Sequence, residues 1–349
     1  MGRKRSKQIW VTDEEKDIFQ KIQEQCELHN LPLTAVKGGW AKSKEASIKW
    51  TNPAYIESGS FDYFGMRDEI IEELKSYAPE YREIERDKLD DGSLLYVNLS
   101  DVHFNKLCED HVSGGYYDLK VARQRVDSGV QRLLTYATAF PIDQIVLIIG
   151  NDILNSDTPT NTTTGGTPQD NDRHWTTAFN IAKNSIISLI ELLLGVADVH
   201  VQHCPSNHDY QTGFFLADSV ASWFHNHPNL TFDVSIRHRK YYEYGLNMIM
   251  SDHGDGVKVA DTPLLMAQEM PEMWGRTRHR YSYKGHVHHK DLRSFQKSKE
   301  YHGVIVEHLS SPTPSDEWHD KNGYKSAQAM ECALHDKRNG KFGHFTHRF

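Results

Sequence analysis

The chain has 349 residues, of which 25% are charged and 38% apolar, with a formal net charge of −8. This length suffices for one large domain or two small ones, and the charge excludes a general DNA-coating protein. No apolar run reaches the roughly 18 residues that span a bilayer, and no apolar core follows the basic residues 3–7. We therefore expect a cytoplasmic protein with no membrane partner. Four cysteines without CxxC spacing argue against a disulfide framework and a zinc ribbon.

The first 91 residues differ in character from the rest. Apolar residues at helical spacing predict helices over 13–29 and 68–77. Between them, Trp40 and Trp50 stand among lysines, a pattern that suits either base stacking or the packing of a small accessory domain. We expect a small, mainly helical accessory region over 1–91 and a second domain over 92–349.

From residue 92 onward, apolar runs of strand length alternate with helical patterns. Strands are predicted over 94–99, 144–150, 199–204, 246–250, 281–284 and 304–306. Helices are predicted over 118–140, 174–194 and 210–224. This alternation indicates an α/β domain.

Five successive predicted strands end in Asp, Asn or His. The segments are Asp101-Val102-His103, Gly150-Asn151-Asp152, Pro205-Ser206-Asn207-His208-Asp209, Asp252-His253-Gly254-Asp255 and Gly285-His286-Val287-His288-His289. A single histidine after a strand is most often a hydrogen-bonded loop residue. Five such ends in order indicate a common site, because strand ends of this kind gather at one edge of a sheet. Carboxylates combined with imidazoles suit Mn, Fe or Zn.

The order D-x-H, G-D, G-N-H-D/E, H and G-H-x-H resembles the calcineurin-like metallophosphoesterase family over roughly residues 92–290. The resemblance implies an α/β (α+β) fold, a four-layer β-sandwich flanked by helices. It also implies a centre of two divalent metal ions at the strand ends. Mn²⁺ is favoured, with Zn²⁺, Fe and Mg²⁺ as alternatives.

The resemblance also assigns roles to individual residues. The implied ligands are Asp101, His103 and His288 for the first ion, Asn207, His253 and His286 for the second, and Asp152 as the bridge. His208 would be the general acid, with Asp209 orienting and charging its ring. Asn151, Asn155 and Ser206 depart from the family pattern, and Asp157 stands two positions after Asn155. None of these departures removes a ligand, so an active enzyme is expected.

Substrate contacts are expected around these motifs. The polar loop 161–168 follows the bridging aspartate and is interpreted as a substrate loop or lid. The basic clusters 237–240 and 276–280 could track a nucleic-acid backbone, or they could be solvated charged faces. The candidate contacts are Asn151, His174, Arg278, Arg280 and His289. For the histidines, the alternative is a surface or packed side chain.

The predicted reaction is metal-dependent hydrolysis of a phosphate ester. The leading hypothesis is a phosphodiesterase acting on nucleic acid, similar to the SbcD-type DNA exonucleases and to phage-encoded members of the superfamily. The alternatives are a phosphomonoesterase, a small-nucleotide phosphodiesterase, or a metal-binding scaffold for protein contacts. The presence of both His208 and Asp209 argues against the scaffold. A nucleic acid or nucleotide is thus the expected partner, and a homodimer is one option for the assembly.

Overall fold

The computed structural model describes residues 81–87, 89–113, 115–286, 298–314 and 327–349, with short pieces at 20, 23–24, 26–27, 38–42 and 47–51. The chain divides into two units, Met1–Pro79 and Glu80–Phe349. Within the first unit, β1 (Gly38–Lys42) and β2 (Ser47–Thr51) form an antiparallel hairpin. The predicted helix over 68–77 lies outside the described residues, and the one over 13–29 lies largely outside them.

The first sheet of the second unit has six strands in the order β13-β12-β3-β4-β5-β6. Its members are β3 (Ser93–Asn98), β4 (Ile142–Gly150), β5 (Asp198–Cys204), β6 (Leu230–Asp233), β12 (Ala329–Asp336) and β13 (Gly340–Arg348). Strands β3 to β6 are parallel, and β12 lies antiparallel to β3. The carboxyl ends of β3, β4 and β5 therefore meet at one edge.

The second sheet has five strands in the order β10-β11-β9-β8-β7. They are β7 (Lys240–Tyr244), β8 (Asn247–Asp252), β9 (His279–Lys284), β10 (Ser298–Tyr301) and β11 (Val304–His308). Strands β8, β9 and β11 are parallel to one another, so they also share a carboxyl edge.

The two sheets pack face to face through alternate residues of their strands. The first sheet contributes Leu94, Tyr96, Val146, Ile148 and Cys204, and the second contributes Ile249, Tyr281 and Tyr283. The rings of Tyr96 and Tyr283 stack across the interface with their centroids 4.3 Å apart. All these side chains are almost fully buried, so this layer holds the inner core.

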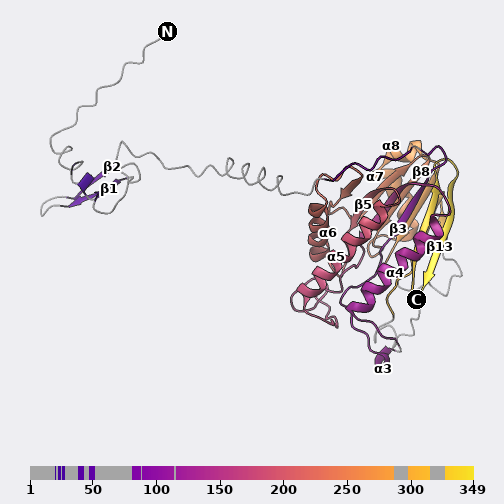
Figure 1. Ribbon diagram of the computed structural model, residues 1–349, viewed down its shortest axis with the longest axis horizontal. Helices are drawn as coiled ribbons and strands as arrows, with labels where there is room; N and C mark the ends of the chain where they lie inside the picture. The colour runs from indigo at the N-terminus through magenta and orange to yellow at the C-terminus, as the bar shows by residue number, and fades with distance from the viewer. Residues whose placement is uncertain are drawn as a thin grey trace, which may run out of the picture. The chain divides into compact units, whose positions relative to one another are not determined.

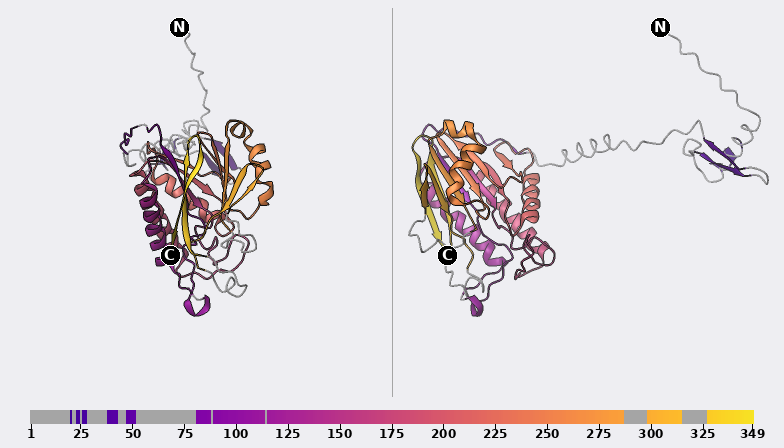
Figure 2. Two further views of the ribbon diagram at one scale, coloured as in Figure 1. Left: turned by 90° about the vertical axis from the view of Figure 1, so that its right-hand side faces the viewer. Right: turned by 180° about the vertical axis from the view of Figure 1, so that it is seen from behind.

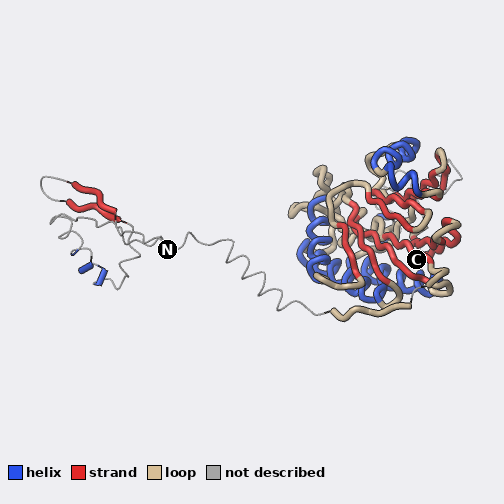
Figure 3. The backbone as a smooth tube through the Cα atoms, turned by 90° about the horizontal axis from the view of Figure 1, so that it is seen from above, coloured by secondary structure: helices blue, strands red, loops and turns tan. Residues whose placement is uncertain are grey.

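Helices cover the two outer faces. On the first sheet lie α4 (Leu119–Ala137), α5 (Trp175–Leu194) and α6 (Tyr210–Trp223), visible together in Figure 1. On the second lie α7 (Thr262–Glu269) and α8 (Pro271–Arg276). A short α3 (Asp110–Ser113) and a 3₁₀ turn (Val259–Asp261) complete the described helices. Figure 2 (left) and Figure 3 show strands in the middle and helices outside. This arrangement confirms the predicted four-layer α/β fold.

Helix α4 shows why the helices could be predicted from the sequence. In α4, the predicted apolar stripe Leu119, Ala122, Val126, Val130, Leu133 and Ala137 is buried. Asp118 caps the helix by accepting a hydrogen bond from the backbone N–H of Val121 at 2.7 Å.

Among the described helices, α5 is long and apolar enough to cross a membrane, and half of its apolar window is buried. This is weak evidence for a membrane span, because a core helix meets the same criteria.

Residues 81–87, which the sequence pattern groups with the N-terminal region, belong to the second unit by their contacts. The Tyr81 hydroxyl donates to the Trp223 carbonyl at 3.1 Å. Arg86 pairs with Asp198 at 3.0 Å and also donates to the carbonyls of Leu194, the last residue of α5, and Val196.

Candidate metal centre

The predicted ligand segments meet where the carboxyl edges of the two sheets face each other. Several of their residues adopt left-handed backbone conformations, with φ of 55° at Asp101, 47° at His103, 60° at Asp152 and 66° at His286. Non-glycine residues reach this region at a cost of about 1–2 kcal/mol each. Such strain clusters at functional sites.

The most crowded donor atom is His253 Nε2. It lies 2.8 Å from Asn207 Oδ1, 3.1 Å from His286 Nδ1 and 3.2 Å from Asp152 Oδ2. One ring nitrogen carries at most one proton and cannot satisfy all three partners. Atoms that each lie ~2.1 Å from one ion in tetrahedral geometry are about 3.4 Å from one another. The four donors therefore have the spacing of a metal ligand set.

The electrostatics of this group also suit a cation. Burial works to raise the pKa of the Asp152 carboxyl, but the surrounding imidazoles of His253, His208 and His103 outweigh it and hold that pKa well below its usual range. Burial works to lower the pKa of His253, yet Asp152 raises it to about 9. The carboxylate thus attracts positive charge to this point, and a metal ion must displace the imidazolium proton to bind there.

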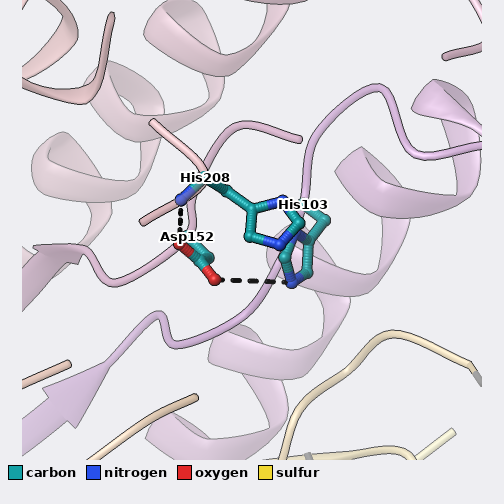
Figure 4. A group of neighbouring side chains, drawn as sticks. All are labelled: His103, Asp152 and His208. Atoms are coloured by element: carbon teal, nitrogen blue, oxygen red, sulfur yellow. Dashed lines mark hydrogen bonds and ion pairs between the residues drawn. The ribbon is translucent and has the colours of Figure 1, made fainter. Parts of the chain in front are cut away.

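A second group shares Asp152. Donor atoms of His103, Asp152 and His208 all lie within 4.8 Å of one another. His103 Nε2 is 4.0 Å from Asp152 Oδ2, and the His103 and His208 rings meet edge to face at 4.6 Å. Figure 4 shows the three side chains gathered at one point. Asp152 is therefore common to both groups, as the bridging assignment requires.

The orientation of His208 differs from the prediction. Its Nδ1 lies 3.0 Å from the Asn155 carbonyl oxygen, which can only accept, so Nδ1 carries the hydrogen. Its backbone N–H donates to Asp152 Oδ1 at 3.0 Å. The assignment of Asp209 as the residue that orients this ring is wrong, because a main-chain carbonyl takes that place. Asn155, at the position where the family often has aspartate, supplies it.

Asp209 has a structural environment instead. The Ser206 hydroxyl donates to its carboxylate at 2.6 Å, and the Leu154 N–H donates at 2.8 Å. The same Ser206 oxygen accepts from the Asp152 N–H at 2.7 Å. Burial, with Asp152 nearby, raises the pKa of Asp209 to about 7. Ser206 and Asp209 thus fix the backbone of Asp152.

Asp101 is held by the neighbouring loop and by the chain after β11. Its carboxylate accepts from the His286 N–H at 3.1 Å and 3.2 Å. Its carbonyl accepts from the hydroxyls of Ser311 and Thr313. A Cβ at Gly285 would lie 3.0 Å from the Asp101 carboxylate, a tighter contact than most side chains make, so glycine suits this close approach. No sequence signal marked Ser311 or Thr313.

Two predicted residues, His288 and His289, lie outside the described residues. His308 was missed by the sequence reasoning. It ends β11, pairs in register with Lys284 and is partly buried. Burial lowers the pKa of its imidazole, as does the nearby charge of Lys284. It carries no motif, and only the register of the second sheet brings it to this edge.

The remaining predicted substrate contacts are engaged elsewhere. Asn151 is fully buried, and its amide donates to Asn98 at 3.2 Å. His174 caps α5 through its Nδ1, which lies 2.8 Å from the Thr176 hydroxyl. Arg280 lies 3.9 Å above the Trp274 ring and donates to the carbonyls of Trp274 and Thr277.

The positions of Arg278 and Arg280 at the start of β9 do not agree with their predicted role as substrate contacts. Arg278 precedes β9 and Arg280 is near its beginning, whereas His286 follows its end. At ~3.3 Å per strand residue, the eight steps from Arg278 to His286 correspond to roughly 25 Å. The cluster 276–280 therefore lies at the opposite edge of the sheet. In the cluster 237–240, Arg239 pairs with Glu269 at 2.5 Å, and the buried Lys240 pairs with Asp233 at 2.9 Å.

The loop after Asp152 is packed against the start of α6. The Asp157 carboxylate accepts from the backbone N–H groups of Gln211 and Thr212, at 3.0 Å and 2.7 Å, and from the Thr164 hydroxyl at 2.9 Å. The Thr164 N–H donates to the carbonyl of Asn207 at 3.1 Å. The loop thus supports the turn that carries Asn207 and His208.

Comparison with known proteins adds little to this picture. No family model and no curated protein matches the sequence. Among solved structures, the chain is similar to a double mutant of Vps29 from Entamoeba histolytica, with 11% identity and a TM-score of 0.27. The match covers 74% of this chain and 99% of that one. A likeness of this size carries no inference about activity. From its own geometry, the protein is a four-layer α/β protein whose clustered His and Asp residues are compatible with a metallophosphoesterase.

Proposed function

We propose that the protein is a metal-dependent phosphoesterase that hydrolyses phosphodiester bonds. The observation that carries the proposal is the set of donor atoms around His253 Nε2, three of them within 3.2 Å. A hydrogen-bonding role cannot use them all, whereas one cation can.

Two divalent ions are part of the proposal. His253, Asn207 and His286 with Asp152 would hold one, and Asp101, His103 and His288 with Asp152 would hold the other; His288 lies outside the described residues. Carboxylate, amide oxygen and imidazole are ligands that suit Mn²⁺, Zn²⁺ and Fe. Divalent ions at such a site polarise the phosphate group and make water a better nucleophile at neutral pH.

His208 is the proposed proton donor to the leaving oxygen. With Nδ1–H bound to the Asn155 carbonyl, Nε2 is the nitrogen available to hold and release a proton. The hydrogen bond from its backbone to Asp152 keeps it beside the bridging carboxylate.

Nucleic acid is the proposed substrate, although the paired arginines above no longer support it. What supports it is the turn between β6 and β7, at the same sheet edge as His208. There Arg237 is exposed, and the ring of His238 stacks on that of Tyr210, the first residue of α6, at 5.9 Å. Exposed rings can stack on bases, and an exposed guanidinium can contact phosphate.

Three substrates separate the alternatives. Purified protein with Mn²⁺ is offered bis-p-nitrophenyl phosphate, p-nitrophenyl phosphate and labelled linear DNA. We expect cleavage of the diester and of DNA, with Arg237→Ala weakening only the latter. A preference for the monoester with intact DNA would contradict the nuclease proposal while leaving phosphoester hydrolysis in place.

A further inference from the structure

A buried ion pair joins the two strands that lead to His253 and His286. Lys284 Nζ lies 2.8 Å and 2.6 Å from the two carboxylate oxygens of Asp252. The two side chains are 0% and 6% exposed. Asp252 and Lys284 form the last register pair between β8 and β9. His253 follows Asp252 directly, and Gly285 and His286 follow Lys284.

Stability alone does not account for this pair. Taking two charges out of water costs free energy that their attraction barely offsets, and a well-packed apolar pair is often at least as stable. Lysine side chains ordinarily extend to keep the ammonium group in water. Lys284 is instead fully covered, on the same face of the second sheet as the apolar Met248 and Met250.

The ion pair between Lys284 and Asp252 lies where it can fix the distance between the candidate ligands His253 and His286. His253 Nε2 and His286 Nδ1 are 3.1 Å apart, and their strands are joined by the ion pair one and two residues earlier. Metal–ligand distances tolerate only about 0.2 Å. A small change in the separation or register of the two strand ends would therefore move one imidazole out of reach of a shared ion.

The charges of the pair also affect a nearby cation. An ammonium group at this place repels a divalent ion, and the carboxylate beside it cancels that repulsion. Loss of the carboxylate alone leaves a buried positive charge next to the site. Loss of the two charges together adds no net charge beside the site, but it removes the contact that joins the ends of β8 and β9.

We propose that Lys284 and Asp252 are positioning residues that set the spacing of His253 and His286 for the ion bound between them. This inference rests on the proposed function, because it presupposes that the two histidines bind metal. Neither residue is expected to touch substrate.

The test compares Mn²⁺ binding by calorimetry and by the Mn²⁺ electron paramagnetic resonance signal. Asp252→Asn should raise the dissociation constant of one of two ions at least about tenfold, as loss of supporting residues at metal sites does. The double variant Lys284→Met with Asp252→Leu should fold stably and still bind that ion more weakly. The conservative pair Lys284→Arg with Asp252→Glu keeps both charges with altered reach and should bind with intermediate affinity.

Lys240→Met is the matched control. Lys240 is also buried, at 1% exposure, and lies in β7 of the second sheet. It pairs with Asp233, the last residue of β6 in the first sheet, at 2.9 Å, and no candidate ligand follows it directly in the chain. We expect it to lose stability and keep the Mn²⁺ dissociation constant. Wild-type Mn²⁺ affinity in both double variants would overturn the positioning role alone. A wild-type protein that binds no Mn²⁺ would overturn the proposed function itself.

Discussion

At the scale of single residues, His208 shows how the surroundings of a side chain decide its role. A carbonyl oxygen, and not the carboxylate of Asp209, accepts its Nδ1–H. The ring therefore has the fixed tautomer that a proton donor needs. The carboxylate nearest to the His208 backbone belongs to Asp152, which lies beside the imidazoles of two other histidines, His103 and His253.

We expect His208→Ala to retain both metal ions and to lose ~10²–10⁴-fold in rate. The loss should be greatest for a poor leaving group such as an alkoxide and smaller for p-nitrophenolate, which needs no proton. Steady-state rates on the two ester types measure this, with the exposed His225→Ala as control. An equal, small loss on both esters would be incompatible with the acid role.

A second residue-scale effect concerns His335, which lies in the inner core and contacts the Tyr283 hydroxyl at 2.9 Å. Burial lowers the pKa of His335 to about 3. Between pH 6.5 and 3 the unfolded chain thus binds more protons than the folded one. The contribution of His335 to the free energy of unfolding is therefore fully present above pH 6.5. Below pH 6.5 it falls by about 1.4 kcal/mol per pH unit as the pH decreases.

His335→Gln should remove that contribution. The slope of unfolding free energy against pH, measured by urea titration between pH 6.5 and 4.5, should be smaller in the variant by about 1.4 kcal/mol per unit. Identical slopes in the two proteins would show that His335 is not held neutral.

At the scale of elements, α6 begins with a cap supplied from far along the chain. Asp209 stands at its N-cap position but makes no side-chain capping bond, and Asp157 accepts from the N–H groups of Gln211 and Thr212 instead. The carboxylate also lies favourably at the positive end of the helix dipole. The loop 155–172 therefore supports the turn that carries Asn207. A loop held by these hydrogen bonds is not suited to open and close as the predicted lid would.

Asp157→Ala should therefore destabilise the protein by about 1–2 kcal/mol, the usual cost of a lost cap. Thermal unfolding measures the effect, and the exposed Asp218→Ala on the same helix is the control. Equal stability of the two variants would contradict the capping role.

Strands β3, β4, β5, β8, β9 and β11 and the long helices α4, α5 and α6 could be predicted because each has a local signal, whereas β6, β7 and β10 were not predicted. The run from Gln144 to Gly150 is apolar throughout, as a strand buried on both faces requires. The hairpin β12–β13 was not anticipated, because it adds to the sheet beside β3 across more than 200 residues of chain. Such pairing has no local cause in its own sequence.

At the scale of the whole molecule, the site depends on two sheets that face each other. The consecutive parallel order of β3, β4 and β5 explains why their ligand segments could be grouped from sequence. The arginines could not be placed, because their partners Glu269 and Trp274 are brought to them only by the packing of α7 and α8. The ion pair between Lys284 and Asp252 was not predicted either, because the register of β8 and β9 brings together two residues that lie 32 positions apart in the chain.

Among the described residues, all members of the three apolar clusters belong to the second unit. We therefore expect residues 80–349 to fold without residues 1–79 and to bind the same number of Mn²⁺ ions. Circular dichroism and metal analysis of the shortened chain measure this. Loss of cooperative unfolding would show that the first unit is needed for the fold.

The central claim is a centre of two metal ions bridged by Asp152, and metal stoichiometry tests it most directly. Metal analysis after equilibration with saturating Mn²⁺ should find two ions per wild-type chain and a loss of both, or of tight binding of both, in Asp152→Asn. Fewer than two ions in the wild type, or two tightly bound ions in Asp152→Asn, would contradict the account.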